Sequence, residues 1–102
     1  MILLDTNILI EVLKNNKRLV ERLNNIEDDF AISSITQMEL FYGAFNKSEI
    51  RKLEKFLLQF ETIHIDERIS KLAINLIKKY AKSHNLNIPD SLIAATAITK
   101  KY

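Results

Sequence analysis

The feature that most constrains this chain is its first segment, in which a short apolar run ends abruptly on polar side chains. Residues 1–4 are Met-Ile-Leu-Leu, and Asp5, Thr6 and Asn7 follow at once. An apolar run of this length favours a strand of a parallel sheet, buried on both faces. Ligands of open α/β sheets bind at the carboxyl ends of the strands, where such a strand would place Asp5. We therefore expect the fold to be organised around this acid.

The rest of the chain repeats a strand followed by two helices. Two more compact apolar stretches, 30–33 and 62–65, are bounded by polar residues and predict strands. The order strand, helix, helix, repeated three times, predicts an α/β fold with a parallel three-stranded sheet flanked by helices. At 102 residues we expect a single domain over 1–102. Helical spacing of apolar residues predicts helices at 8–13, 19–26, 35–45, 48–60, 67–82 and 89–102.

Composition excludes several classes of protein. The 47% hydrophobic and 27% charged fractions, with one Gly and one Pro, are those of a globular protein. The absence of Cys excludes a disulfide framework and Cys-based zinc sites, so any metal must be held by oxygen or histidine. Neither a signal peptide nor a membrane span is predicted, and we expect a cytoplasmic protein. A net charge of +2 gives no strong electrostatic case for nucleic acid.

Asp5 is the first candidate functional residue. No basic residue stands near it in the sequence, so its placement at a strand end requires a cation or hydrogen bonds to compensate the charge. The alternative is that Asp5 caps the helix that follows, although Asn7 is also a plausible N-cap. Position at the ligand edge favours a functional role.

Two further acids occupy the first turns of predicted helices. Glu39 projects from an otherwise apolar sector, but Thr36-Gln37-Met38-Glu39 also fits a capping box, in which Glu39 bonds the Thr36 amide. Asp90 follows Pro89, where an acid complements the helix dipole without any other reason. Both alternatives stay open on local sequence alone.

These acids could converge, because strand ends and the first turns of the following helices share one edge of the sheet. Asp5, Glu39 and Asp90 would then offer carboxylate oxygens, which suit a hard cation such as Mg²⁺ or Mn²⁺. Such an ion can polarise a phosphodiester and activate a bound water, and the Thr6 hydroxyl could assist. His64 and His84 lack ligand spacing and are interpreted as exposed or helix-end residues.

The aromatic residues near the middle of the chain have two interpretations. Phe41, Tyr42 and Phe45 are predicted to be core side chains rather than platforms for base stacking. Tyr42 is the one most able to reach a cleft.

Three motifs in order resemble the PIN-domain ribonucleases, and within them the VapC toxins. They are Leu-Asp-Thr-Asn at 4–7, Ser-Ile-Thr-x-x-Glu-Leu-x-x-Gly at 34–43, and Ile-Pro-Asp-x-x-Ile-Ala-Ala-x-Ala at 88–97. Each motif is short, but their order and separations within one strand and helix succession make a specific signal over nearly the whole chain.

The resemblance implies a metal-dependent endoribonuclease. It makes Asp5, Glu39 and Asp90 the metal-binding acids, with Mg²⁺ or Mn²⁺ as cofactor, and Thr6 a nearby catalytic helper. It also implies a structured RNA substrate such as tRNA or rRNA, a homodimer, and a cognate antitoxin that inserts a segment into the active-site groove. The reachable part of such an RNA is single-stranded or looped.

The chain departs from the family pattern at its end, because PIN domains normally continue into another strand with a fourth acidic or amide residue. We therefore expect the first strand to be an open edge, Asp5 to lack one neighbour, and metal binding to be weakened. Dimerisation or exchange between protomers would cover the last helix. This departure favours a second hypothesis, a catalytically weak PIN-like module that binds an antitoxin, RNA or itself. A third is a structural domain in which all three acids are caps.

Overall fold

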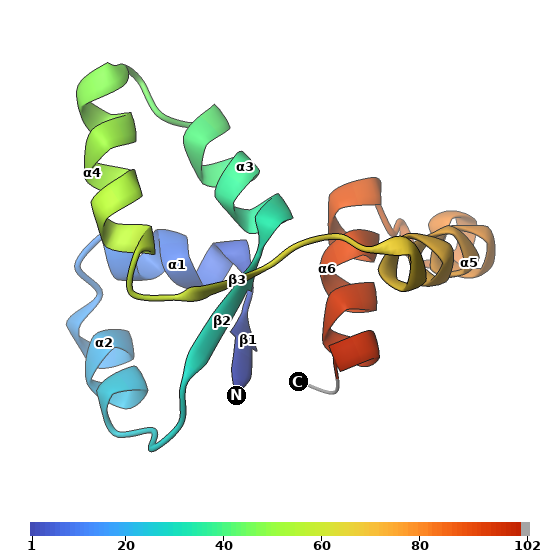
Figure 1. Cartoon of the computed structure of the whole chain (residues 1–102), viewed down its shortest axis with the longest axis horizontal. Coiled ribbons are helices and arrows are strands. Elements are labelled where there is room, and N and C mark those ends of the chain that lie inside the picture. The colour runs from blue at the N-terminus through green and yellow to red at the C-terminus, as the bar shows by residue number, and fades with distance from the viewer. Residues whose placement is uncertain (101–102) are drawn as a thin grey trace.

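The computed structural model describes residues 1–100, and in this part of the chain the predicted order of strands and helices is confirmed (Figure 1). The predicted last helix extended to residue 102, and residues 101–102 lie outside the described part. The elements are β1 (Ile2–Leu4), α1 (Thr6–Leu13), α2 (Lys17–Asn24), β2 (Phe30–Ser33), α3 (Ser34–Tyr42), α4 (Lys47–Leu57), β3 (Glu61–Ile63), α5 (Glu67–His84) and α6 (Ile88–Lys100).

The three strands form a parallel sheet in the order β1-β2-β3, as the sequence predicts. Leu4 of β1 is opposite Ile32 of β2, and Ser33 of β2 is opposite Ile63 of β3. Within residues 1–100, β1 pairs with β2 alone, so the first strand is an edge of the sheet. Because all three strands run the same way, the residues that follow β1 and β2 emerge at one end of the sheet.

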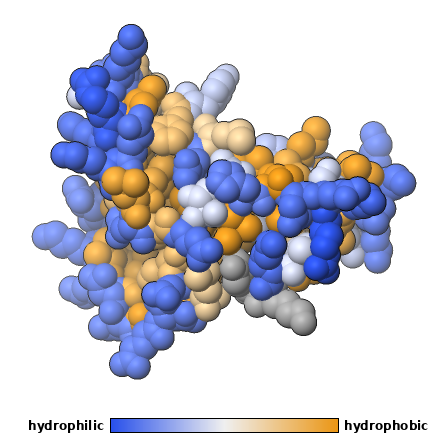
Figure 2. Space-filling view, in the orientation of Figure 1, coloured by the Kyte–Doolittle hydropathy of each residue, from blue (hydrophilic) through white to orange (hydrophobic). Residues whose placement is uncertain are grey.

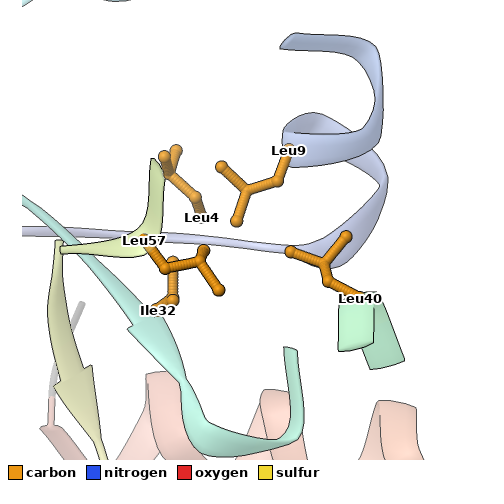
Figure 3. Packing of buried hydrophobic residues seen from close by; sticks show 5 residues of the cluster. All are labelled: Leu4, Leu9, Ile32, Leu40 and Leu57. Atoms are coloured by element: carbon orange, nitrogen blue, oxygen red, sulfur yellow. The ribbon is translucent and has the colours of Figure 1, made fainter. Parts of the chain in front are cut away.

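Side chains of the strands alternate between two hydrophobic cores, one on each face of the sheet. On the first face Leu4 and Ile32 pack with Leu9, Leu40 and Leu57, all 8% exposed or less (Figure 3). Fully burying one such side chain is worth about 1.5–3 kcal/mol. The second core contains the buried residues Ala31, Ile63, Ile69, Ala73 and Ala95.

The helices form a layer on each side of this sheet. Figure 1 shows α1 to α4 on one side and the α5–α6 pair on the other. In the face drawn in Figure 2, hydrophilic residues cover the outer parts of both layers, and hydrophobic residues show mainly between them. No helix in the described residues is long and apolar enough to cross a membrane.

Two expectations about burial are wrong. Phe41 packs against the first core as predicted, but Tyr42 is 93% and Phe45 is 92% exposed. The reason for Phe45 is that α3 ends at Tyr42, three residues before the predicted end of the helix at residue 45, so Phe45 lies in the connection to α4. Most residues of α6 are buried or partly buried, although Ile88 and Ile98 are 68% and 58% exposed. Residues of α6 that include Leu92 and Ala95 pack in the second core.

Candidate functional site

The four residues singled out in the sequence line one cleft at the carboxyl ends of β1 and β2. Asp5 and Thr6 come from the β1–α1 junction, Glu39 from α3 and Asp90 from the first turn of α6. The cavity has a volume of about 600 Å³. Sequence reasoning missed its other lining residues, which carry no charged group: Asn7, Ile10, Leu86, Ile93 and Ala94.

Asp5 is held at the mouth of this cleft by the helix it precedes. Its backbone is extended, with φ −85° and ψ 170°, and its Oδ1 accepts a hydrogen bond of 2.9 Å from the Ile8 amide. Asp5 is therefore the N-cap of α1, and the expectation that Asn7 is the cap is wrong, since the helix begins at Thr6. The cap uses one of the two carboxylate oxygens. Because the other oxygen stays available, Asp5 can cap α1 and bind a ligand at the same time.

Glu39 is held by a different contact from the one its local sequence suggests. The capping box with Thr36 is not formed, because Ser33 caps α3 and its Oγ accepts from the Ile35 amide at 3.1 Å. Glu39 Oε1 instead accepts a hydrogen bond of 2.7 Å from the Thr6 hydroxyl. Thr6 Oγ1 also lies 3.0 Å from Oγ1 of Thr36. The two threonines therefore connect the start of α1 to α3.

Asp90 comes to the cleft from the opposite layer of the fold. Its backbone amide donates a 2.8 Å hydrogen bond to Asn87 Oδ1, so Asn87 supplies an acceptor to an amide in the first turn of α6. An Asn three residues before the acid is an N-cap signal that sequence reasoning missed. Asn87 supplies the side-chain acceptor at the start of the helix, and Asp90 is exposed beside the cleft.

The charged side chains that line the cleft are all acidic. Asp5, Glu39 and Asp90 are all exposed carboxylates, and within residues 1–100 no Lys or Arg lines the cavity. Carboxylates gathered without a basic partner attract cations and repel other anions. His64 and His84 do not line it either, and His84 Nδ1 lies 2.7 Å from Ser83 Oγ.

The donor set fits a hard divalent cation in its chemistry, since it offers carboxylate and hydroxyl oxygens and no sulfur. Within the described part of the chain, no three acidic or histidine side chains lie close enough to bind one ion together. Mg²⁺ commonly uses one or two carboxylates and keeps several of its waters, for which the 600 Å³ cavity has room. A cation here would be held partly through water.

Comparison with known proteins gives one family match and several close structural likenesses. The family model described as "PIN domain" matches residues 2–101. Ribonuclease VapC10 of Mycobacterium tuberculosis (strain ATCC 25618 / H37Rv) is 33% identical over 100 residues, covering 95% of this chain and 74% of the relative.

Two solved structures are similar over 99% of this chain. A toxin–antitoxin complex from Klebsiella pneumoniae matches with a TM-score of 0.83 and 31% identity, covering 81% of that chain. FitAcB from Neisseria gonorrhoeae matches with a TM-score of 0.78 and 32% identity, covering 83% of that chain. With a matching family model over nearly all of its length, the chain belongs to the PIN domain family.

Proposed function

We propose that this chain is a metal-dependent endoribonuclease of the VapC type, folded as a single domain over 1–102. Asp5, Glu39 and Asp90 are its metal-binding acids, and Thr6 is a nearby catalytic helper. One observation carries the proposal: the four residues come from three separate segments and line a single cleft. The chain belongs to the PIN domain family, and a relative 33% identical to it is named a ribonuclease.

The proposed cofactor is Mg²⁺ or Mn²⁺, held by oxygen atoms of the cleft. When bound, such an ion polarises the phosphodiester and lowers the pKa of a water for attack in line with the leaving oxygen. Without a cation the three carboxylates would repel the phosphate of an RNA strand. Cleavage should therefore depend strictly on a divalent ion.

The protein's own contribution is to hold the carboxylates in place before substrate arrives. The hydrogen bond from the Ile8 amide fixes Asp5, and the hydrogen bond from Thr6 fixes Glu39. Ile10 and Ile93 give the same cavity an apolar part of its wall. Donors fixed in advance need no reorganisation during the reaction.

The proposed substrate is a structured RNA such as tRNA or rRNA, cut in a single-stranded or looped region. The proposal is supported by the exposure of all three carboxylates, which allows approach of a flexible strand. In a double-helical RNA the nucleotides are held by pairing and stacking, whereas those of a loop can be splayed out into a cavity.

The proposed partners are a cognate antitoxin and a second copy of this chain, in the cytoplasm. Support for an antitoxin comes from the similar solved structures, which include a toxin–antitoxin complex from Klebsiella pneumoniae and VapBC2 from Rickettsia felis. Support for a homodimer comes from apolar side chains that α3 and the turn after it expose: Met38, Tyr42 and Phe45 are 60%, 93% and 92% exposed. Exposed apolar groups of this size are typical of interfaces.

A second candidate is a PIN-like module with weak or no catalysis, which binds an antitoxin, RNA or itself. It is favoured by the spacing of the acids, because no three ligand side chains in residues 1–100 converge on one point. Such a module would bind RNA or a protein partner without cutting RNA in the presence of Mg²⁺.

The deciding experiment measures RNA cleavage with Mg²⁺ for the wild type and for Asp5→Asn. Asparagine keeps the N-cap and removes the charge. Asp66→Asn is a matched control, since Asp66 Oδ1 caps α5 through a 2.9 Å bond from the Ile69 amide and Asp66 is not among the residues that line the cleft. The nuclease proposal requires that only Asp5→Asn lose activity. Equal background cleavage in all three proteins would reject it.

A metal-dependent shift in thermal unfolding separates the remaining candidates. A cation that binds the folded state alone raises the unfolding temperature. A shift that requires both Asp5 and Asp90 excludes the purely structural hypothesis, in which the acids are only caps. A shift without cleavage identifies the binding module.

A further inference from the structure

The side chain of Thr36 is completely buried, and its hydroxyl contacts a residue that lines the cleft. Thr36 lies in α3 with an exposed fraction of 0%. Its Oγ1 is 3.0 Å from Oγ1 of Thr6, which is in turn 2.7 Å from Glu39 Oε1. No buried side-chain nitrogen or oxygen in the described residues lacks a partner. The contact with Thr6 therefore satisfies the Thr36 hydroxyl.

The direction of these two hydrogen bonds follows from the number of protons. Thr6 has one hydroxyl proton and two oxygen neighbours, so it can donate to only one of them. An ionised carboxylate accepts hydrogen bonds and never donates them, so Thr6 uses its hydroxyl proton to donate to Glu39. The Thr36 hydroxyl must then donate to Thr6. The two hydrogen bonds therefore run in one direction, from the interior to the cleft: Thr36 donates to Thr6, and Thr6 donates to Glu39.

The three hydrogen-bonded side chains differ in their freedom to move. Thr36 cannot turn away, because it is enclosed on all sides within the packed end of α3. Thr6 is partly exposed and Glu39 is exposed, so both would otherwise sample several rotamers. A donor from the interior selects one orientation of the Thr6 hydroxyl, and that hydroxyl selects one orientation of the carboxylate.

We infer that Thr36 is a positioning residue, which acts through Thr6 to hold the Glu39 carboxylate ready for a divalent cation. The inference rests on the proposed function. Partners that orient a metal ligand typically alter metal affinity or activity by about 10- to 100-fold when they are removed. Thr36 has the features of such a partner: it is not among the residues that line the cleft, and it bonds to Thr6, which holds Glu39.

The test compares variants that differ in one hydroxyl. Thr36→Val keeps the shape and removes the donor, whereas Thr36→Ser keeps the donor and removes a methyl group. Thr96→Val is the matched control, because Thr96 is also 0% exposed but its hydroxyl donates to Leu92 O, in its own helix, at 2.7 Å. Two readouts are used: the Mn²⁺ dissociation constant by calorimetry, and the Thr6 side-chain rotamer by NMR couplings to its methyl carbon in the metal-free protein.

We expect Thr36→Val to weaken Mn²⁺ binding by about 10-fold and to average the Thr6 rotamers. Thr36→Ser and Thr96→Val should match the wild type in both readouts. Thr36→Ala, which also removes the donor and adds no bulk against Thr6, replaces the valine variant if that variant does not fold.

The outcomes distinguish this inference from the proposed function. If the wild type binds Mn²⁺ and Thr36→Val binds it equally well with a single Thr6 rotamer, the positioning role is wrong and the proposed function stands. An equal loss in Thr96→Val would also overturn the positioning role, since any buried hydroxyl would then have the same effect. A wild type with no affinity for Mn²⁺ overturns the proposed metal site itself, and the inference with it.

Discussion

The Thr6 hydroxyl lies 2.7 Å from Glu39 Oε1, although 33 residues separate the two in the chain. Parallel pairing produces this contact: β1 and β2 end side by side, so the helices that follow them begin side by side. The hydrogen bond joins two parts of the proposed site before any ligand arrives.

Removing that hydrogen bond should reduce activity much more than stability. We expect Thr6→Val to lower metal-dependent cleavage by about 10- to 100-fold, because Glu39 loses the donor that orients it. Thr6→Ser should retain activity, since it keeps the hydroxyl. Cleavage rates and thermal unfolding of both variants check this, and equal activity of the valine and serine variants would contradict it.

Two substitutions of Asp5 should separate its role as the N-cap of α1 from its proposed role as a metal ligand. Asp5→Asn should keep the N-cap and nearly all stability but abolish the Mg²⁺-dependent rise in unfolding temperature. Asp5→Ala removes the cap as well, which lowers the free energy of unfolding by about 1 kcal/mol. Urea unfolding with and without Mg²⁺ measures both effects. A Mg²⁺ shift that survives in Asp5→Asn would exclude Asp5 as a ligand.

The first core should be sensitive at Leu9, which is 0% exposed and packs with Leu4 and Leu40 (Figure 3). We expect Leu9→Ala to lower the free energy of unfolding by about 2–5 kcal/mol, through lost burial and a residual cavity. Leu13→Ala, at the exposed end of the same helix, should have a much smaller effect, because Leu13 is already 40% exposed. Denaturant unfolding of the two variants gives the comparison.

The pH dependence of stability should include a contribution from Asp66. The hydrogen bond from the Ile69 amide, helped by Lys100 Nζ at 3.4 Å, lowers the pKa of Asp66 below its ordinary 3.8. A folded-state pKa below the unfolded value stabilises the fold at pH values above the unfolded pKa. The contribution is lost as the pH falls through the folded pKa.

Asp66→Asn cannot titrate and keeps the cap, so it isolates this effect. The difference in unfolding temperature between wild type and variant should be constant from neutral pH down to about 5, and should shrink below about 4. Thermal scans between pH 7 and pH 2.5 measure the difference. A difference independent of pH would show that the charge of Asp66 has no part in stability.

Self-association should depend on the apolar side chains at the end of α3. If the proposed dimer uses them, the double substitution Tyr42→Ser and Phe45→Ser should give a monomer in sedimentation velocity. Leu58→Ser is the control, because Leu58 is 82% exposed and follows α4, in a different part of the chain. An unchanged sedimentation coefficient in the double variant would move the interface elsewhere.

The sequence predicts the succession of elements well, because it depends on apolar spacing. The ends of helices were harder to place. Both Ser33 and Thr36 have hydroxyl side chains that suit an N-cap, and local rules do not choose between them. The choice is made by the register of β2, since Ser33 still pairs with Ile63 as the last residue of the strand. Tertiary pairing therefore decides where α3 begins.

The cleft could be predicted as a gathering of acids, but not as a set of contacts. Strand ends and the starts of the helices that follow them share an edge in parallel sheets, and that rule brings Asp5 and α3, which carries Glu39, to the same edge. Asp90 lies on α6, which follows a helix, so its place beside the cleft depends on how α6 packs. The contact between Thr6 and Glu39 depends on the distance between two helix starts, which no pattern along the chain encodes. Thr36 was interpreted only as a cap for the same reason.

Each of the two cores, one on each face of the sheet, includes a helix that also carries an acid of the cleft. Leu40 adjoins Glu39 and belongs to the first core, while Ala95, further along the helix that begins beside Asp90, belongs to the second. A genetic selection for inactive forms would therefore collect substitutions at interior positions such as these together with substitutions of the acids. A map of inactivating mutations would outline the packing that sets the width of the cleft, and would include residues that no substrate touches.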